Sequence, residues 1–266
     1  MLSRSISRVV ALIMWQKIRG ELLPAPLVNI ILFSAAEVQL PLPRHDPRAR
    51  HILEVLRRET GGNFDAGLIN GPRGKATLRA ITDDTLILSF AWGAAPPPLA
   101  PIHLIVGLPR PQTARDILRE GTALGLAAMD FVRTDRGDPG YAQSSLWASR
   151  EWEDLLIAGA AQAFCTRLPT VRHGQTLVEA ITPLPADYAR VALDNYEAPG
   201  ALRDFDPAGR PAVVLALGAE RGWSAAERTL LLRNRFMFAH LGDRVLRTET
   251  ACIAAITLLK ARLGLA

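Results

Sequence analysis

Two glycine-bearing turns near the C-terminus constrain this chain more than any other feature. The first follows an apolar stretch and reads Leu-Ala-Leu-Gly-Ala-Glu-Arg-Gly-Trp-Ser over residues 215–224. The second reads Leu-Gly-Asp-Arg-Val-Leu-Arg-Thr-Glu-Thr-Ala over residues 241–251. Glycine lacks a Cβ atom and tolerates positive φ, so such turns let a ligand approach the backbone, and the free N–H groups of a following helix lie beside it. The pair predicts a cofactor that is held mainly by main-chain groups.

The second half of the chain alternates apolar runs with amphipathic segments, which predicts an α/β domain with a mostly parallel sheet. The expected strands are 102–107, 127–132, 190–193, 212–217 and 236–241. The expected helices are 113–124, 145–164, 225–233 and 247–262, the last of them buried nearly all round. The first strand leads into Gly107-Leu-Pro-Arg-Pro rather than a G-x-G-x-x-G loop, which argues against an ordinary Rossmann domain and a nucleotide-binding oxidoreductase.

The first third of the chain predicts a smaller β domain. Strands are expected at 29–33, 64–69, 75–81 and 85–91, with a helix over 47–58. The proline-rich residues 96–101 cannot continue a helix or a central strand and are interpreted as a linker. We therefore expect a small domain over 29–95 and a larger domain over 102–266. Residues 1–28 are interpreted as an extension, either disordered or the product of a misassigned start, with a short packed helix or a targeting signal as alternatives.

Charge is unevenly distributed in this 266-residue chain, whose formal net charge is +5. Residues 44–79 hold eight Arg or Lys against four Asp or Glu, so this stretch carries most of the excess and favours a polyanionic partner. The two cysteines and five histidines form no disulfide framework and no metal-ligand spacing. No apolar run reaches the roughly 18 residues that a membrane span needs, and we expect a cytoplasmic protein that binds neither metal nor membrane.

The two turns resemble the C-terminal signature of the RsmE family, the bacterial 16S rRNA uridine N3-methyltransferases of the SPOUT superfamily. The family's second turn usually reads Leu-Gly-x-Arg-Ile/Val-Leu-Arg-Thr-Glu-Thr-Ala, and residues 241–251 match it almost letter for letter. The family's first turn usually reads Gly-Pro-Glu-Gly-Gly-Phe/Leu-Ser. This chain keeps four of those positions, which are Gly218, Glu220, Gly222 and Ser224. It departs at Ala219, where the family has proline, and at Arg221, where the family has glycine.

The resemblance covers roughly residues 29–264 and implies a fold and a function. The implied fold is α/β, a SPOUT-type methyltransferase domain tied in a trefoil knot, with a smaller N-terminal PUA-like β-barrel domain. The implied protein is a homodimeric enzyme that uses S-adenosyl-L-methionine to methylate N3 of a uridine in 16S rRNA or the small ribosomal subunit. Its cofactor would lie on residues of the two turns, namely Leu217, Gly218, Ala219, Glu220, Gly222, Leu241, Gly242, Arg244, Val245, Leu246, Arg247, Thr248 and Glu249.

Methylation at N3 requires removal of a weakly acidic proton, which a base or a polarising arginine would assist. The candidates that the resemblance suggests are Arg247, Arg167 and Arg136. The family's Gly-Arg pair upstream of Arg167 is replaced here by Phe164-Cys165, and a Lys and a Glu are missing from the segment 119–125. Because the cofactor half is preserved and the substrate half is eroded, a non-catalytic RNA-binding relative acting in ribosome assembly is the alternative.

Residues 43–57 resemble the family's His-His-x-x-x-Val-Leu-Arg segment in the PUA-like domain. Phosphate contacts from basic side chains would orient the RNA and make binding depend strongly on salt. The candidate RNA-binding residues are Arg44, Arg50, His51, Arg57, Arg73 and Lys75. The alternative is a solvated basic face without a partner. Cys165 lies at a helix end with no nearby histidine and is interpreted as structural.

Overall fold

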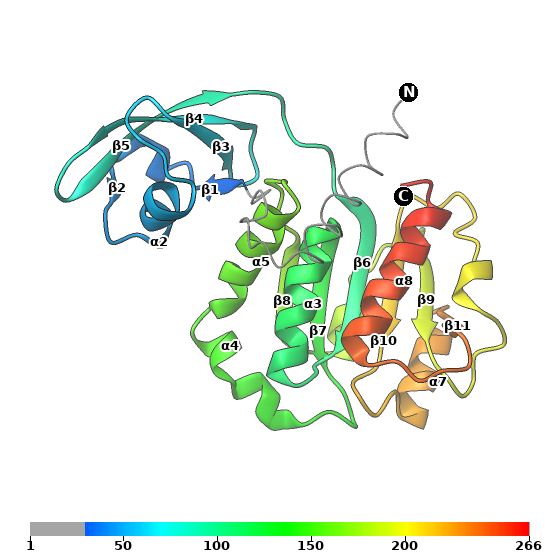
Figure 1. Cartoon of the computed structure of the whole chain (residues 1–266). Helices are drawn as coiled ribbons and strands as arrows, with labels where there is room; N and C mark the ends of the chain where they lie inside the picture. Colours follow the sequence, from blue (N-terminus) through cyan, green and yellow to red (C-terminus); the bar gives the residue numbers. More distant parts are fainter. Residues whose placement is uncertain (1–29, 266) are drawn as a thin grey trace, which may run out of the picture.

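The computed structural model describes residues 30–265, and the extension expected over 1–28 lies outside them. The chain forms a five-stranded sheet in its first third and a six-stranded sheet in the remainder, joined by the run of prolines (Figure 1). The larger sheet is covered by helices on both faces, whereas the smaller one wraps around its own short helix.

The N-terminal sheet has the strand order β1-β3-β4-β5-β2 and is antiparallel except for the parallel pair β1 and β3. Its strands are β1 (Ile31–Phe33), β2 (Leu42–Pro43), β3 (Asn63–Leu68), β4 (Arg73–Ile81) and β5 (Thr85–Trp92). The helix expected over 47–58 is shorter: α2 (Pro47–Arg50) continues as a π-helical turn that ends at Val55. Asp46 starts α2, because its Oδ1 accepts a hydrogen bond from the Arg48 amide at 2.8 Å.

The C-terminal sheet is parallel throughout, as the alternation of strands and helices predicts, and has the order β11-β9-β10-β6-β7-β8. Its strands are β6 (Ala100–Gly107), β7 (Leu126–Arg133), β8 (Thr170–Thr176), β9 (Ala189–Leu193), β10 (Val213–Leu217) and β11 (Met237–Ala239). The strand β8 is absent from the sequence-based prediction because it is polar and lies at the sheet edge. The strand β6 begins at Ala100, inside the segment expected to be a linker.

Two groups of helices cover the two faces of this sheet. Helices α3 (Pro111–Ala123), α4 (Ser145–Ala148), α5 (Glu151–Gln162) and α8 (Thr248–Arg262) share one apolar core with the strands. Helices α6 (Leu177–Ile181) and α7 (Ala225–Arg233) share the core of the opposite face. The central strand β10 is buried along its whole length, which explains its continuous apolar sequence.

Three sequence-based expectations for this part of the chain are corrected. The helix expected over 145–164 is two helices, because Arg150 adopts a left-handed conformation with φ of 63° between them. The last helix is buried on one face only, and Ile253 on the other face is 37% exposed. The strand expected over 236–241 ends at Ala239, where the chain turns into the second glycine turn.

The segment between α5 and β8, residues 163–169, holds the two sheets together. The Asn70 amide donates to the Thr166 carbonyl at 2.7 Å, and the Thr166 hydroxyl donates to the Gly71 carbonyl at 2.6 Å. The guanidinium of Arg73 donates to the Phe164 carbonyl at 3.0 Å and lies over the Phe164 ring. An apolar cluster that includes Ile30 backs these contacts. The β3–β4 hairpin is therefore fixed against the larger part of the chain.

Candidate functional site

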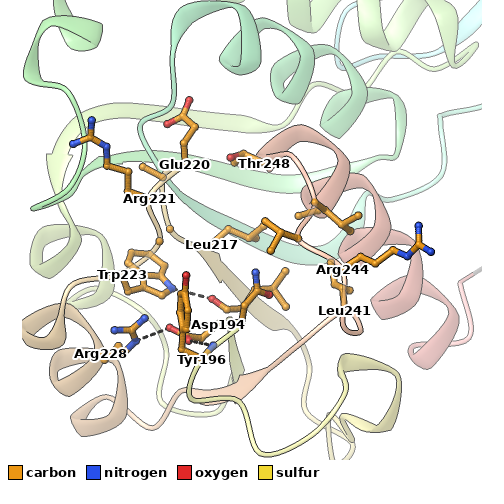
Figure 2. A pocket seen from close by; sticks show the side chains of 18 residues that line it. Asp194, Tyr196, Leu217, Glu220, Arg221, Trp223, Arg228, Leu241, Arg244 and Thr248 are labelled. Carbon is orange, nitrogen blue, oxygen red and sulfur yellow. Dashed lines mark hydrogen bonds and ion pairs between the residues drawn. The ribbon is translucent and has the colours of Figure 1, made fainter.

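A pocket opens where β9, β10 and β11 end (Figure 2). Its walls are the loop after β9, the first glycine turn after β10, the second glycine turn after β11 and the first turn of α8. The carboxyl ends of parallel strands are where open α/β sheets bind ligands. Ten of the thirteen residues predicted to bind the cofactor line this pocket: Leu217, Gly218, Ala219, Glu220, Gly222, Leu241, Arg244, Val245, Leu246 and Thr248.

The first glycine turn packs tightly against β6. A Cβ atom on Gly107, the last residue of β6, would lie 2.4 Å from the Ala219 nitrogen, so only glycine lets the turn approach. The turn leads into α7, which Ser224 and Glu227 cap reciprocally through a capping box. These contacts fix the path of the turn on both sides.

The second glycine turn is open to solvent. Gly242 has φ of 110°, a conformation that side-chain-bearing residues rarely adopt, and its amide donates to Nδ1 of His240 at 3.0 Å. Val245 is 82% exposed although it is apolar. Gly242, Arg247 and Glu249 do not line the pocket: Arg247 is exposed at the N-cap of α8, and Glu249 accepts a long hydrogen bond from Thr113 on α3.

Sequence reasoning missed the loop after β9, where Asp194 and Tyr196 line the pocket. Asp194 Oδ1 accepts hydrogen bonds from the amides of Tyr196 and Glu197 at 2.8 and 3.0 Å, and its Oδ2 accepts one from Nε of Arg228 at 2.6 Å. Burial alone would raise the pKa of Asp194, but these hydrogen bonds outweigh burial and lower it. The polar run Asp-Asn-Tyr-Glu (194–197) directly follows an apolar strand, and this pattern could have identified the loop as part of a site.

The indole of Trp223 completes this side of the pocket. It is fully buried, and its Nε1 donates to the Leu193 carbonyl at the end of β9 at 3.1 Å (Figure 2). The bond joins the first glycine turn to the loop after β9. The Asp194 amide also donates to the Ala239 carbonyl at 3.0 Å, so hydrogen bonds link the loop after β9 to the first glycine turn and to the end of β11, which leads into the second.

A second hollow, which we name the arginine hollow, adjoins the pocket. It is lined by Arg110, Arg136, Gly137, Asp138, Pro139, Tyr141, Glu220 and Arg221, the last two of which also line the pocket. Nη1 of Arg136 donates to the Arg221 carbonyl at 3.1 Å, and the Arg110 amide donates to Oε1 of Glu220 at 3.0 Å. The first glycine turn is the wall between the two hollows.

The structure separates the three arginines predicted to be catalytic. Arg136 lies in the arginine hollow, and Arg247 lies one residue before Thr248, which lines the pocket. Arg167 lies three residues before β8 begins, and its Nε donates to the Pro96 carbonyl at 3.4 Å. It is therefore at the amino ends of the strands, opposite the pocket, and cannot reach the pocket of its own chain.

The residues predicted to bind RNA fall into two groups. Arg44, Arg50 and Arg57 are exposed on the N-terminal sheet and its helix, and His51 is half-buried beside them. The other two and Arg44 have partners: Arg73 holds the segment before β8, the exposed Lys75 pairs with Asp65 at 2.7 Å, and Nη1 of Arg44 donates to the Thr82 carbonyl at 3.1 Å. Arg50 and Arg57 are the most available for phosphate contacts, because their exposed side chains make no hydrogen bond or ion pair within residues 30–265.

Residues 30–265 contain no group of three or more His, Cys, Asp or Glu side chains that could hold a metal ion. Across the same residues, every helix is too short or too polar to span a bilayer. Cys165 is half-buried, whereas Cys252 is buried in the core, and burial raises the pKa of the Cys252 thiol.

The sequence and the fold both match known methyltransferases. A family model described as an RNA methyltransferase domain matches residues 95–260. The ribosomal RNA small subunit methyltransferase E of Treponema pallidum is 34% identical over 240 residues, covering 86% of this chain and 89% of that protein. The corresponding protein of Borreliella burgdorferi is 26% identical over 231 residues, covering 86% of this chain and 95% of that protein.

A solved structure shares the fold of both sheets. It is a ribosomal RNA small subunit methyltransferase E from Neisseria gonorrhoeae bound to S-adenosyl methionine, with a TM-score of 0.72 and 23% identity over 87% of this chain and 97% of that one. The family model spans more than half of this sequence, and the Treponema relative is aligned over more than two thirds of it. The chain therefore belongs to the ribosomal RNA small subunit methyltransferase E family, the RsmE family of RNA methyltransferases.

Proposed function

We propose that this protein is an S-adenosylmethionine-dependent methyltransferase that modifies N3 of a uridine in 16S rRNA. The observation that carries the proposal is that the two glycine turns, which resemble the family signature, line one and the same pocket. Since the substrate would be ribosomal RNA, we expect the enzyme to act in the cytoplasm.

The residues of the pocket fit the cofactor. Leu217, Leu241 and Leu246 provide apolar surface for the adenine and methionine groups, and the backbone of both turns provides donors and acceptors beside it. Val245 is an exposed apolar side chain at the rim, as expected where a ligand or a second subunit covers it. When bound, S-adenosylmethionine would supply an activated methyl group.

The arginines near the pocket are suited to stabilising negative charge but not to removing a proton. Guanidinium groups stay protonated in proteins, so Arg136 and Arg247 cannot take the proton from N3. They can stabilise the negative charge that develops on the uracil ring as that proton leaves. We therefore assign stabilisation of the ring charge to Arg247, which adjoins Thr248 of the pocket, and assign proton removal to neither arginine.

A homodimer is the proposed working form. Arg167 lies at the far end of the sheet from the pocket of its own chain, so it could reach a pocket only from a second copy. Apolar side chains near the pocket are exposed, among them Tyr196, Val245, Leu246 and Ile253. Covering them in a dimer would remove this surface from water.

Two finer features of the fold are also proposed. The first is the trefoil knot, which is supported by His240: its amide donates to the Gly200 carbonyl and its carbonyl accepts from the Leu202 amide, so the chain after β11 runs beside the β9–β10 crossover. The second is a PUA-like barrel over residues 29–95, supported by the curled, mostly antiparallel N-terminal sheet (Figure 1) and by the exposed Arg44, Arg50 and Arg57.

The test has two parts and uses the full-length protein. Calorimetric titration with S-adenosylmethionine measures cofactor binding, and transfer of labelled methyl groups to 16S rRNA or assembled small subunits measures activity. Micromolar binding with transfer to uridine N3, located by mass spectrometry, is the expected result. Binding without transfer to either substrate would favour the non-catalytic RNA-binding relative, and absence of binding by folded protein would overturn the proposal.

A further inference from the structure

The arginine hollow gathers three guanidinium groups from three separate segments. Arg110 is the N-cap of α3, Arg136 follows β7, and Arg221 belongs to the first glycine turn. All three residues are exposed to solvent at the same opening. Their convergence comes from the fold, since they are separated by 26 and 85 residues in the sequence.

Little in the hollow neutralises these charges. The closest ion pair joins Nε of Arg110 to Glu220 at 4.0 Å, and the guanidinium of Arg136 is bonded to a backbone carbonyl. Within residues 30–265 the guanidinium of Arg221 makes no hydrogen bond or ion pair. Guanidinium groups that line one opening repel one another, and an anion bound among them relieves that repulsion.

The two carboxylates of the hollow already serve the backbone. Glu220 accepts a hydrogen bond from the Arg110 amide at 3.0 Å. Asp138 accepts one from the Gly140 amide at 2.8 Å and so begins a short 3-10 helix. These contacts shape the loops around the opening. Among the described residues, Arg110 is engaged only through Nε, by Thr113 at 3.4 Å and Glu220 at 4.0 Å, and Arg136 only through Nη1, so both keep N–H groups for a ligand. Guanidinium is the side-chain group best suited to bidentate contacts with phosphate oxygens.

We infer that the arginine hollow binds a backbone phosphate of the substrate RNA, adjacent to the nucleotide that is methylated. The inference rests on the proposed function and adds to it the residues that position the target. Glu220 and Arg221 line both the hollow and the pocket, so a phosphate in the hollow lies across one turn of chain from the cofactor. Tyr141, which is half-buried in the wall, offers an aromatic surface to a neighbouring base.

A cofactor carboxylate is the other anion that could reach these arginines. Arg110 and Arg136 line the hollow but not the pocket, whereas only Arg221 lines both. Two of the three guanidinium groups therefore lie outside the space that the cofactor would occupy. The geometry favours an anion that belongs to the RNA strand, and separate measurements of RNA affinity and cofactor affinity distinguish the two anions.

The experiment measures RNA and cofactor binding separately in Arg110→Ala, Arg136→Ala and the double variant. Fluorescence anisotropy with a 16S rRNA fragment gives Kd across a series of salt concentrations, and calorimetry gives the affinity for S-adenosylmethionine. We expect the double variant to bind RNA at least about ten-fold more weakly. The slope of log K against log salt should fall by about 0.7 to 0.9, the value for one phosphate. Cofactor affinity should be unchanged.

Two variants serve as controls. Arg233→Ala removes an exposed arginine from the last turn of α7, at the opposite end of that helix from the pocket, and should leave the slope unchanged. Arg136→Lys keeps the charge and should restore most of the slope, which a purely structural role for Arg136 would not predict. Thermal unfolding of each variant confirms that it is folded.

The contrary outcomes are distinct. An unchanged RNA slope with weakened cofactor binding would assign the hollow to the cofactor and overturn the inference. If the variants bound both RNA and cofactor with wild-type affinity and salt dependence, the hollow would be a solvated surface and the inference would be overturned. The proposed methyltransferase function would be unaffected. Wild-type protein that binds no cofactor and methylates no RNA would instead refute the proposed function, and the inference with it.

Discussion

Nε of Arg228 donates a hydrogen bond to Oδ2 of Asp194 across 2.6 Å, with side chains that are only 11% and 2% exposed. Removing one partner of a buried pair leaves the other charge without compensation, which costs about 3–5 kcal/mol. We therefore expect Arg228→Met to lower the free energy of unfolding by about that amount, measured by denaturant titration. An Asp194→Asn, Arg228→Met double variant should lose less than the sum of the two single variants. Additive losses would mean that the two side chains act independently.

A second buried carboxylate makes stability depend on pH. Burial alone would raise the pKa of Asp130, but hydrogen bonds from His103 and Arg172 outweigh it and hold the pKa below the ordinary value of 3.8. A carboxyl with a lowered folded-state pKa stabilises the protein fully above its unfolded-state value and loses that contribution as pH falls through the folded-state value.

Denaturant titrations at several pH values give the free energy of unfolding of wild type and of Asp130→Asn. We expect wild type to be the more stable by a constant amount above about pH 5, and this difference should shrink as pH falls below 3.8. If the free energy of unfolding depended on pH equally in both proteins, Asp130 would not contribute to the acid sensitivity.

Arg150 is a site where a single substitution should stabilise the fold. It has φ of 63° between α4 and α5, is exposed, and pairs with Glu153 at the surface. A left-handed conformation costs a side-chain-bearing residue about 1–2 kcal/mol, whereas an exposed i,i+3 pair returns only about 0.3–0.5 kcal/mol. We expect Arg150→Gly to raise the unfolding free energy by about 0.5–1 kcal/mol. A loss of stability would show that the pair outweighs the backbone strain.

Weakening the contact between the two sheets at Thr166 should lower the affinity for RNA more than the affinity for cofactor. Thr166 is fully buried, and Thr166→Val removes the hydroxyl that donates to the Gly71 carbonyl at 2.6 Å. Leaving that carbonyl without its donor should cost about 1–3 kcal/mol in unfolding free energy. RNA affinity should fall while cofactor affinity stays constant, and the exposed Thr229→Val is the matched control. Equal loss of both affinities would indicate general unfolding instead.

The second glycine turn provides a direct test of the cofactor pocket. Gly242 has φ of 110° with open space around it, so Gly242→Ala strains the backbone without a steric clash. Alanine is about 1–2 kcal/mol less favourable than glycine in this conformation, so we expect the turn that carries Leu241 and Arg244 to relax away from the pocket in the free protein and cofactor affinity to fall about ten-fold. Gly200→Ala, at a glycine with open space and no positive φ, should bind as wild type does. Similar affinities for both variants would place the cofactor elsewhere.

The sequence was most informative where structure depends on local pattern. Apolar runs identified β6, β7, β9 and β10 because strands in the interior of a parallel sheet are mostly apolar, although β6, β7 and β9 each include a polar residue. The edge strand β8 was missed because its polar Arg172 is stabilised by Asp130, 42 residues away in sequence. The break at Arg150 has no glycine or proline to signal it.

The candidate site was likewise predictable from sequence only where it depends on local pattern. Motifs within single segments identified the two glycine turns that line the pocket. The contribution of Asp194 depends on Arg228, 34 residues later, and the distance of Arg167 from the pocket depends on the packing of the segment before β8. Such relations arise from tertiary structure, which no local pattern in one sequence reveals.

The position of the N-terminal sheet sets a minimum length for the substrate. Within one chain, that sheet is fixed at the amino end of β8, whereas the pocket opens at the carboxyl ends of β9, β10 and β11 in the same parallel sheet. The seven residues of β8 extend about 23 Å. At about 3.4 Å per stacked nucleotide, an RNA that contacts both places on one chain needs about seven nucleotides between them. Shorter fragments could engage both only by bridging two copies, so methylation should decline sharply with dilution for short substrates before it does for long ones.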